Sequence, residues 1–531
     1  MKLRTRVMAM FTLLIVFFTV IPIQSDAGVY SGSGVVSNNI HEHEYTSNSK
    51  VSNSYLCNNM DGTFSRIENM GDGILVEKYN SSMQLINQAV KPFELTTFGG
   101  FYADANYRYL IFGQENPAQN DTLECIRIVK YSKDWVKIGS ASIKACNTTI
   151  PFYGSGVDIC EYGNYLYVRM GHRTYADANG AYHQASMTFS YNIANNQIAD
   201  VQSNISSASY GSFENSAAQF IDTTGGVITT LDQSLNAPRG FVVTKYNNAA
   251  GTQVFRSACA YANAFPFSGT AGSTATNCCV GGYEVSSQYY LVAGATSPQD
   301  GSSPNRNIFI AAVPKNTFAS NAISVAYLTG YANGEMMSVC TPYMIKISQN
   351  QFIVMWEARY GYSDMEKVYY AYIDGTGKRI GEVQSMDGCL SDCQPILFNG
   401  NVLWYTTNGA NTRLYTIAVT APAPTPGSVA VNPSNVYAGV DYSSVYDFNY
   451  YINHYSDVRI LYGNNPIAAI QHFVQYGMAE GRQGCENFSV TIYRDNYADL
   501  RNAYGNDLKQ YYYHFITNGS SEGRNARTLI N

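Results

Sequence analysis

The chain is 531 residues long, 45% of it is hydrophobic, and its formal net charge is only −6. This length exceeds one ordinary hydrophobic core, so we expect about two to four domains. No basic tract indicates nucleic-acid binding, and no acidic tail indicates a disordered solubilising segment. The chain holds 45 tyrosines, a residue type that suits half-buried strands and adhesive surfaces, because its ring packs while its hydroxyl stays hydrated.

The N-terminus has the pattern of a secretion signal. Lys2, Arg4 and Arg6 precede an apolar stretch at 7–23, and small residues follow up to Ala27. We therefore predict a signal peptide over 1–27, cleaved near Ala27, and a secreted, extracellular protein. The alternative is an uncleaved membrane anchor. No other stretch reaches about 18 apolar residues, so the mature chain is not expected to be an integral membrane protein.

Residues 28–50 are rich in Gly, Ser, Asn and His, and they predict a flexible leader. Its HEHE stretch at 41–44 has two histidines in a metal-binding spacing, but in a mobile leader we expect them to be solvated. The chain also has 11 cysteines, an odd number that leaves at least one outside a disulfide. We interpret them as small buried hydrophobic residues, with or without some disulfides.

Short strand-like runs fill residues 51–420, rich in Val, Ile, Tyr, Phe and Thr and bounded by Gly, Asn, Asp and Pro. A pair of such runs recurs along the chain. The first member of the pair is FSRIEN, YLIFGQEN, YLYVRMGHR, GVITTLDQ, YYLVAGAT, FIVMWEAR or NVLWYTTN. The second member is ILVEKYN, IRIVKYS, SMTFSYNI, FVVTKYN, NIFIAAVPK, VYYAYIDGTG or TRLYTIAV. Repeats of this kind, about 45 to 63 residues apart, predict a β-propeller of four-stranded blades.

Closure of the blades into a ring stacks each sheet on its neighbours and leaves only short edges exposed. The first unit lacks a recognisable innermost strand and the last unit lacks an outermost one. We therefore expect the N-terminal segment to complete the final blade. The prediction is a mainly β fold, with a seven-bladed propeller over 51–420. Six blades is one alternative, and a tandem of β-sandwiches is another.

The two faces of the predicted propeller differ. Loops between the two recurrent runs are long and polar, whereas the hairpins of the opposite face are short. Long polar loops on a rigid scaffold commonly carry function. Planar donors and carboxylates among tyrosines suit a glycan or an acidic sugar, because they grip hydroxyls while the rings stack on the sugar. We predict that the ligand-binding residues of this long-loop face are His172, Arg173, His183, Gln184, Asp232, Arg239, Arg306, Glu357 and Asp392.

A carbohydrate-active enzyme, either a glycoside hydrolase or a polysaccharide lyase, is the alternative hypothesis. A glycosidase needs two carboxylates across a cleft, and Asp232, Glu357, Asp364 and Asp392 are candidates. No GxSxG, HExxH, GxGxxG or P-loop motif occurs, so no catalytic residue is assigned. ADANG at 176–180 resembles part of a calcium loop but lacks the closing glutamate. We predict no cofactor and no metal, with calcium as the one alternative.

Three stretches of the body resemble uncharacterised secreted propeller-like proteins of clostridia and related Gram-positive bacteria. They are HQASMTFSY at 183–191, RNIFIAAVPKNTF at 306–318 and LSDCQPILFNGNVLWY at 390–405. The resemblance covers most of 55–420 and implies a propeller without a settled activity. One departure is SFENSAAQFI at 212–221, where a His-Ser-Phe sequence would be expected before QFI.

A linker rich in Pro, Ala and Ser is predicted at 421–440, and two 42-residue repeats follow over 441–531. The matched positions of the repeats include Tyr451, Asp457, His472, Glu480 and Arg482 in the first unit and Tyr493, Asp499, His514, Glu522 and Arg524 in the second. Each unit is expected to form two short helices. In the first unit, Gly463 ends the first helix, Pro466 lies in the first turn of the second, and Gly477 ends the second. We favour a structural role for Glu480 and Arg482 over ligand contact.

The repeated HF and G-x-x-EGR pattern resembles the tandem Tyr- and Gly-rich repeats that close many clostridial cell-surface and cell-wall hydrolase proteins. This resemblance implies association with the cell envelope. Taken together, the sequence predicts a secreted, envelope-associated propeller that binds cell-wall or extracellular glycans, or surface proteins, and we favour a binding protein over an enzyme. The further alternative is a structural surface or matrix component.

Overall fold

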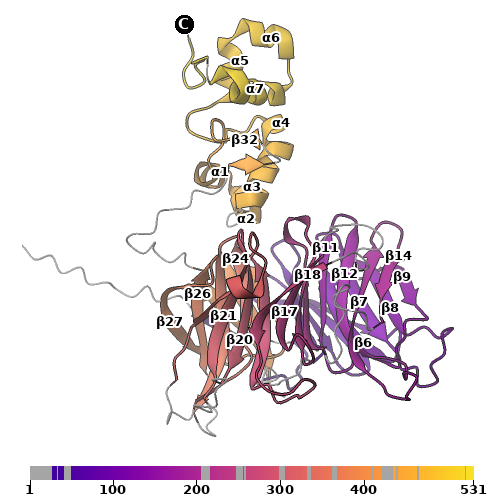
Figure 1. Ribbon diagram of the computed structural model, residues 1–531. Coiled ribbons are helices and arrows are strands. Elements are labelled where there is room, and N and C mark those ends of the chain that lie inside the picture. Colours follow the sequence, from indigo (N-terminus) through magenta and orange to yellow (C-terminus); the bar gives the residue numbers. More distant parts are fainter. Residues whose placement is uncertain are drawn as a thin grey trace, which may run out of the picture.

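The computed structural model describes residues 27–32, 34–40, 50–204, 216–246, 255, 259–297, 305–331, 337–360, 367–409, 411–419, 435–437, 440–462, 466–520 and 522–530. Strands dominate up to residue 418, and helices occur from residue 448 onward. Figure 1 shows the strands in one large ring-like body and the helices gathered in a second, smaller body. The predicted signal peptide up to residue 26 and the HEHE stretch lie outside the described residues.

Seven antiparallel sheets follow one another along the chain, and we call them blades 1 to 7. Blade 1 contains β2 (Ser54–Asn58), β3 (Phe64–Asn69), β4 (Gly73–Tyr79) and β5 (Leu85–Pro92). Blade 2 contains β6 (Thr97–Ala103), β7 (Tyr107–Gly113), β8 (Ile126–Ser132) and β9 (Lys137–Ile143). Blade 3 contains β10 (Ile150–Pro151), β11 (Val157–Tyr162), β12 (Tyr165–Arg173), β13 (Gln184–Asn192) and β14 (Gln197–Gln202). Blade 4 contains β15 (Ser216–Asp222), β16 (Thr229–Ser234), β17 (Gly240–Tyr246) and β18 (Cys259–Pro266).

The remaining three blades follow the same order from the centre outward. Blade 5 contains β19 (Cys278–Val285), β20 (Tyr289–Thr296), β21 (Asn307–Pro314) and β22 (Ser324–Tyr327). Blade 6 contains β23 (Met337–Val339), β24 (Tyr343–Ser348), β25 (Gln351–Tyr360), β26 (Lys367–Asp374) and β27 (Arg379–Asp387). Blade 7 contains β28 (Ile396–Phe398), β29 (Asn401–Thr407), β30 (Thr412–Ala418) and β1 (Ala27–Gly32).

The prediction of a seven-bladed propeller is confirmed. The two recurrent runs of the sequence are the second and third strands of each blade, which are the strands hydrogen-bonded on both sides. These strands are almost continuously buried because both faces of every blade are covered. Seven separate hydrophobic clusters fill the seven joints between neighbouring blades, and the last joins blade 7 to blade 1.

The N-terminal segment closes the ring. Strand β1 pairs antiparallel with β30, from Ala27 opposite Ile417 to Gly32 opposite Thr412, and supplies the outermost strand of blade 7. This confirms the predicted completion of the final blade by the N-terminus. Two expectations were wrong. Blade 1 has its own innermost strand, β2, and residues 28–32 of the expected leader, with Ala27 before them, form a strand because β30 offers them a free edge.

A buried ion network locks this closure. The Arg66 guanidinium contacts Glu68, donates to Glu77 Oε2 at 2.7 Å and lies over the ring of Tyr405 in blade 7, 4.8 Å from its centroid. Arg66 also donates to the carbonyl oxygen of Val35 at 2.7 Å, and the Val35 amide donates to Glu77 at 2.6 Å. The chain that follows β1 is therefore held between the first and last blades by charge-assisted hydrogen bonds.

The helical body consists of two similar units. The first contains α1 (Phe448–His454), α2 (Ser456–Tyr462), α3 (Pro466–His472), the π-helical turn η5 (Phe473–Gly477) and α4 (Met478–Glu480). The second contains α5 (Val490–Asn496), α6 (Ala498–Tyr504), α7 (Leu508–His514) and the π-helical turn η6 (Phe515–Gly519). A small β-ribbon of β31 (Val436–Tyr437) and β32 (Val440–Asp441) precedes them, inside the region predicted as linker. Residues 421–434, 438 and 439 of the predicted linker are not among those described.

Two details of the helical prediction were wrong. The expected first helix is divided at Tyr455, which has an extended backbone with φ −119° and ψ 103°. The second helix does not end at Gly477 but continues to Glu480, and Gly481 ends it with a left-handed φ of 73°. Gly463, expected to end the first helix, lies outside the described residues.

Gly477 has a packing role instead. A Cβ atom at this position would lie 2.4 Å from the hydroxyl of Tyr451, and a Cβ atom at the equivalent Gly519 would lie 2.0 Å from that of Tyr493. The repeated glycine therefore allows a tyrosine side chain to lie directly against the π-helical turn.

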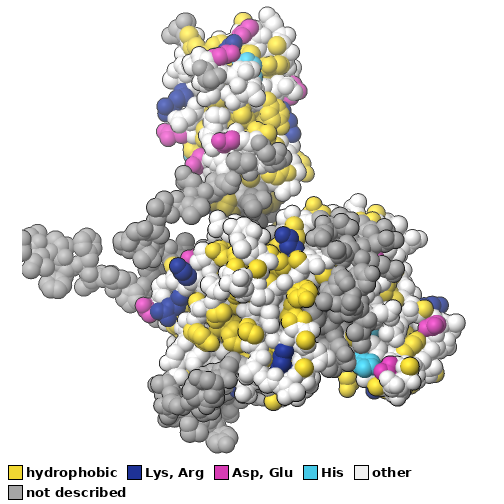
Figure 2. All heavy atoms as spheres, in the orientation of Figure 1, with side chains coloured by type: hydrophobic (Ala, Val, Ile, Leu, Met, Phe, Trp, Pro, Cys, Tyr) yellow, Lys and Arg dark blue, Asp and Glu magenta, His cyan; other side chains and the backbone are white. Residues whose placement is uncertain are grey.

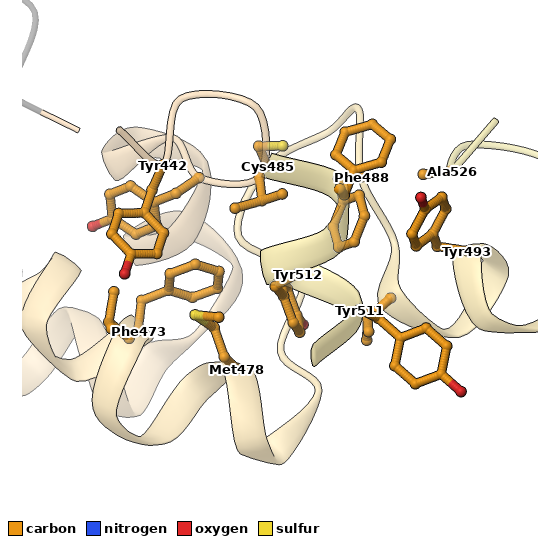
Figure 3. Packing of buried hydrophobic residues seen from close by; sticks show 14 of the residues in the cluster. Tyr442, Phe473, Met478, Cys485, Phe488, Tyr493, Tyr511, Tyr512 and Ala526 are labelled. Atoms are coloured by element: carbon orange, nitrogen blue, oxygen red, sulfur yellow. The ribbon is translucent and has the colours of Figure 1, made fainter. Parts of the chain in front are cut away.

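The two units share one hydrophobic core (Figure 3). Tyr512 of the second unit lies between Phe473 of the first, at 5.6 Å between ring centroids, and Phe488, at 5.1 Å. Its hydroxyl donates to the carbonyl oxygen of Arg482 at 2.8 Å. Neither unit buries its aromatic residues without the other, so the pair forms a single domain. No helix of the described chain is long and apolar enough to cross a membrane.

Candidate functional site

Three of the nine predicted ligand-binding residues are buried inside or between blades. Asp232 accepts two hydrogen bonds from Arg169 at 2.8 Å, and both side chains are inaccessible to solvent. His172 is also fully buried, its Nδ1 lies 2.9 Å from Thr148 Oγ1, and burial lowers its pKa to about 4. Glu357 is 2% exposed and accepts from the Leu390 amide at 2.5 Å. The expectation that these three lie on an exposed face was wrong.

Three other predicted residues come together on the long loop of blade 3. Arg173 and Gln184 are directly opposite each other in the pairing of β12 with β13. The Arg173 guanidinium lies over the ring of Tyr182, 4.7 Å from its centroid, and His183 Nε2 lies 3.2 Å from Asp177. These residues form a local surface cluster that remains a predicted ligand contact.

Asp177 belongs to ADANG, the stretch that suggested calcium. Its side chain accepts from the amides of Asn179 and Ala181 at 2.8 and 2.9 Å, so it stabilises its own turn. Among the described residues, no group of three or more His, Cys, Asp or Glu side chains is arranged to hold a metal ion.

The last three predicted residues lie apart from one another. Arg239 donates to the carbonyl oxygens of Leu235 at 3.0 Å and Ser273 at 2.7 Å, which ties two loops of blade 4 together. Arg306 is half-buried just before β21. Asp392 accepts from the Asn53 amide at 2.5 Å and lies at the centre of the ring. The nine residues therefore do not form one continuous site.

A central cavity of about 590 Å³ lies where the innermost strands surround the propeller axis. Its wall comes from the innermost strands β2, β6, β11, β15, β19 and β24 and from the segment before β28. The aromatic part of the wall consists of Tyr55, Tyr102, Phe220, Tyr283 and Tyr343. Asp392 is the one predicted ligand-binding residue that lines it.

Carboxyl groups are the main charged groups of the cavity wall, and they are Asp158, Glu161, Asp222, Glu284 and Asp392. Burial, reinforced by the negative charge of Asp222, raises the pKa of Asp158 to about 7. Burial also raises the pKa of Glu284 to about 8, although Lys346 acts in the opposite direction. The cavity therefore holds carboxyl groups that remain partly protonated at neutral pH.

Two hydrogen bonds position Asp158. Its Oδ2 accepts from the Ile221 amide of the neighbouring blade at 2.8 Å, and its Oδ1 accepts from the Ile159 amide at 2.9 Å. On the next strand, the Thr223 hydroxyl donates to the Glu161 carbonyl oxygen at 2.7 Å. The innermost strands of blades 3 and 4 are thus joined side by side, which holds the carboxyl groups of both at the cavity wall.

One feature of the sequence does indicate this site, namely acidic residues within apolar strands. VDICEY and CCVGGYEV place acidic residues inside otherwise apolar strands, where a charge is costly unless it faces a partner or a cavity. The predicted site residues come mainly from the loops between second and third strands, whereas the cavity is lined mainly by first strands.

The repeat positions form two equivalent clusters in the helical domain, each with a buried tyrosine and more exposed charged residues. Tyr451 Oη lies 3.0 Å from His472 Nδ1, and Tyr493 Oη lies 2.9 Å from His514 Nδ1. The Arg482 guanidinium contacts Asp457 at 2.7 Å and Glu480 at 2.5 Å. The matching contacts of the second unit are Arg524 to Asp499 at 2.8 Å and to Glu522 at 2.6 Å.

Each of these arginines also lies over a tyrosine ring, Arg482 over Tyr455 at 4.9 Å and Arg524 over Tyr497 at 4.7 Å. The tyrosine hydroxyl in turn accepts from a backbone amide in the segment after the last helix of the same unit. These contacts give the EGR residues a structural role, because they fasten that segment to the start of α2 or α6.

No protein-family model matches the chain, and no curated protein matches its sequence. Among solved structures, it is similar to an oligogalacturonate lyase from Vibrio parahaemolyticus, with 6% identity over 75% of this chain and 98% of the other and a TM-score of 0.39. It is also similar to a GH43 protein from Bacillus licheniformis, with 9% identity over 68% and 60% of the two chains and a TM-score of 0.30. A third similarity is to oligopeptidase B from Leishmania major, with 7% identity over 65% and 41% of the chains and a TM-score of 0.33. Likenesses this distant carry no argument about function.

Proposed function

We propose that the protein is a secreted glycan-binding protein of the cell envelope, and that the central cavity of the propeller takes the end of a glycan chain. The observation that carries this proposal is the cavity itself, which has about 590 Å³ of space and a wall of tyrosine rings, carboxyl groups and amides. A volume of this size is in the range of small-molecule sites.

The chemistry of the wall suits a sugar. Carboxyl and amide groups accept and donate hydrogen bonds to hydroxyls, while rings such as Tyr55, Tyr102 and Tyr283 offer apolar surface to a pyranose face. The amide of Gln394, which is exposed, and Asp392 lie on the segment that leads into β28. This segment connects two blades on the same face as the long polar loops, so a longer glycan that leaves the cavity there would pass the predicted cluster around Arg173.

The helical domain is proposed to hold the protein at the envelope. Strand β30 runs antiparallel to β29, so the chain leaves the propeller on the face opposite the long loops. Attachment through the C-terminal domain would leave the long-loop face available. Figure 2 shows few charged side chains on the visible surface of either body, which agrees with recognition by hydrogen bonds and aromatic rings more than by net charge.

A glycan array with the full mature chain tests the proposal, with binding expected to at least one class of cell-wall or extracellular glycan. Tyr283→Ala and Asp222→Asn should each weaken that binding by about tenfold or more, since each removes a contact inside the cavity. Glu382→Gln is the matched control, because Glu382 is 90% exposed on the outermost strand of blade 6. Binding that is unchanged by both cavity substitutions would overturn the assignment of the site.

A carbohydrate-active enzyme is the second candidate, and the protonation of the cavity favours it. A carboxylic acid with a pKa of about 7, as for Asp158, can donate a proton at neutral pH while a nearby ionised carboxylate acts as nucleophile or base. Release of reducing ends or unsaturated products from a polysaccharide panel, abolished by Asp158→Asn, would support this reading. Binding without turnover would support the binding protein.

A further inference from the structure

The cavity carries more negative than positive groups. Five carboxyl groups line it, and the only lysine or arginine among the described lining residues is Lys50. Two further lysines approach from the side, but both ammonium groups are held on backbone carbonyls, Lys346 on Val285 and Lys315 on Ser286, each at 2.6 Å. The ammonium groups of Lys346 and Lys315 are therefore directed at the backbone, and negative groups outnumber positive ones on the cavity wall.

Repulsion between these negative groups acts on the pKa values of the carboxyl groups in the wall. The negative charge of Asp222 contributes, after burial, to the raised pKa of both Asp158 and Glu284. Burial and the nearby Asp104 raise the pKa of Glu161 in the same direction. A positive charge introduced into the cavity would reverse these effects, because the ionised form of each carboxyl group would gain a partner.

A second observation points to a bound polar molecule. Gln219 on β15 lines the cavity and is only 3% exposed, yet neither its amide nitrogen nor its oxygen has a hydrogen-bond partner. Gln233, 1% exposed on β16, lines the same cavity with an amide nitrogen that also lacks one. Buried amides without partners cost free energy, and a ligand with donors and acceptors would satisfy them.

Asp232, close to the cavity, is a carboxylate whose charge is neutralised by a protein side chain. Gln219 is paired in register with Asp232, which is fully satisfied by the bidentate contact with Arg169. None of the described residues that line the cavity is an arginine, so Asp158, Asp222 and Glu284 have no bidentate partner of this kind among them. The described carboxyl groups are also not gathered into a three-ligand cluster of the kind that holds a metal ion. Their spread around the wall suits an organic cation that also carries hydroxyl groups.

We propose that the cavity is specific for a cationic sugar, a glucosamine-type residue with a free ammonium group. The ammonium would lie beside Asp222, with Asp158 and Glu284 further along the wall, and the hydroxyl groups would meet the amides of Gln219 and Gln233. This inference rests on the proposed function and deepens it, because it names the class of glycan. Binding would release protons, since the ammonium favours the ionised form of each carboxyl group.

Isothermal titration calorimetry of the full mature chain at pH 6.5 tests the inference, with a glucosamine hexamer and an N-acetylglucosamine hexamer as probes. The glucosamine hexamer should bind at least about tenfold more tightly, because acetylation removes the charge. Repetition in two buffers of different ionisation enthalpy should reveal proton release for the glucosamine hexamer alone. Asp222→Asn and Glu284→Gln should each reduce the preference for the charged hexamer by about tenfold, whereas Glu382→Gln should leave it unchanged.

The outcomes separate the two levels of the proposal. Equal or tighter binding of the acetylated hexamer, or of another neutral glycan, would overturn the cationic specificity and leave the glycan-binding function standing. Binding of no glycan at all would overturn both. If a carboxyl variant fails to fold, as judged by circular dichroism, Gln219→Leu provides the second test, because it removes only the amide contact and should weaken the glucosamine hexamer by a similar factor.

Discussion

Substitution of Arg66 by Met tests how the ring is closed. Arg66 is fully buried, and its removal leaves Glu68 and Glu77 without their positive partner in a joint that solvent does not reach. Breaking a buried ion pair by removing one partner typically costs about 3–5 kcal/mol. For a propeller of about 390 residues, unfolding entropy is roughly 0.8 kcal/mol/K, so we expect the Tm to fall by about 4–6 °C. Differential scanning calorimetry measures this change directly.

Two comparisons make the test specific for the buried network. Arg379→Met removes an exposed arginine that lies 3.6 Å from Glu382, and it should shift the Tm by less than about 1 °C. The triple variant Arg66→Met, Glu68→Leu, Glu77→Leu should recover most of the loss, because apolar residues often replace a buried ion network at little cost. A single variant as stable as the wild type, or a triple variant less stable than the single one, would refute the reasoning.

Three further outcomes are expected. The folded-state pKa values of Asp158 (about 7) and Glu284 (about 8) exceed those of the unfolded chain. The contribution of these two groups to stability is therefore present at low pH and is lost as the pH rises toward 8. The double variant Asp158→Asn, Glu284→Gln should accordingly show a smaller fall of Tm between about pH 5 and 8 than the wild type. Gly477→Ala should destabilise the helical domain by about 1–3 kcal/mol, because the new methyl group meets a tyrosine hydroxyl. Hydrogen exchange of peptides from this domain measures the effect, and unchanged protection would contradict the prediction. Cys125 and Cys146 are buried free thiols that both contact Thr148, so we expect mild oxidation to link them to each other. Peptide mass spectrometry that finds either one linked elsewhere would argue against this expectation.

The blade architecture could be predicted because it depends on local pattern. Second and third strands such as β20 and β21 are covered on both faces, which requires an apolar run of fixed length and a turn at its end. Innermost and outermost strands are less regular, since one edge of each is free of strand pairing. This is why β2 of blade 1, with the sequence SYLCN, was missed.

The cavity could not be predicted, because it depends on residues distant in the sequence. Asp158 and Ile221 are 63 positions apart and are brought together only by the contact between blades 3 and 4. In the same way, the burial of Asp232 follows from its pairing with Arg169, which nothing in either strand reveals alone. Loop length predicts only where the long loops lie, whereas the size of the cavity depends on the radius of the closed ring.

In the helical domain, the repeat itself was correctly identified, and its hydrogen bonds recur in both units. The role of Gly477 was not evident, because a glycine at a helix end and a glycine that admits a neighbouring ring look the same in sequence. Only the structure shows the hydroxyl of Tyr451 against it.

The pairing of β1 with β30 has a mechanical consequence. A protein held by its C-terminal domain transmits any pull on that domain to the end of β30, which is hydrogen-bonded to β29 on one side and to β1 on the other. Ala27 pairs with Ile417 near the C-terminal end of β30. A force that enters β30 at this end therefore acts at once on the hydrogen bonds to both neighbouring strands. A pull directed along the strands would load the ladder bonds on both sides together in shear instead of opening them one at a time. The N-terminal strand would thus strengthen the propeller against tension applied through the helical domain.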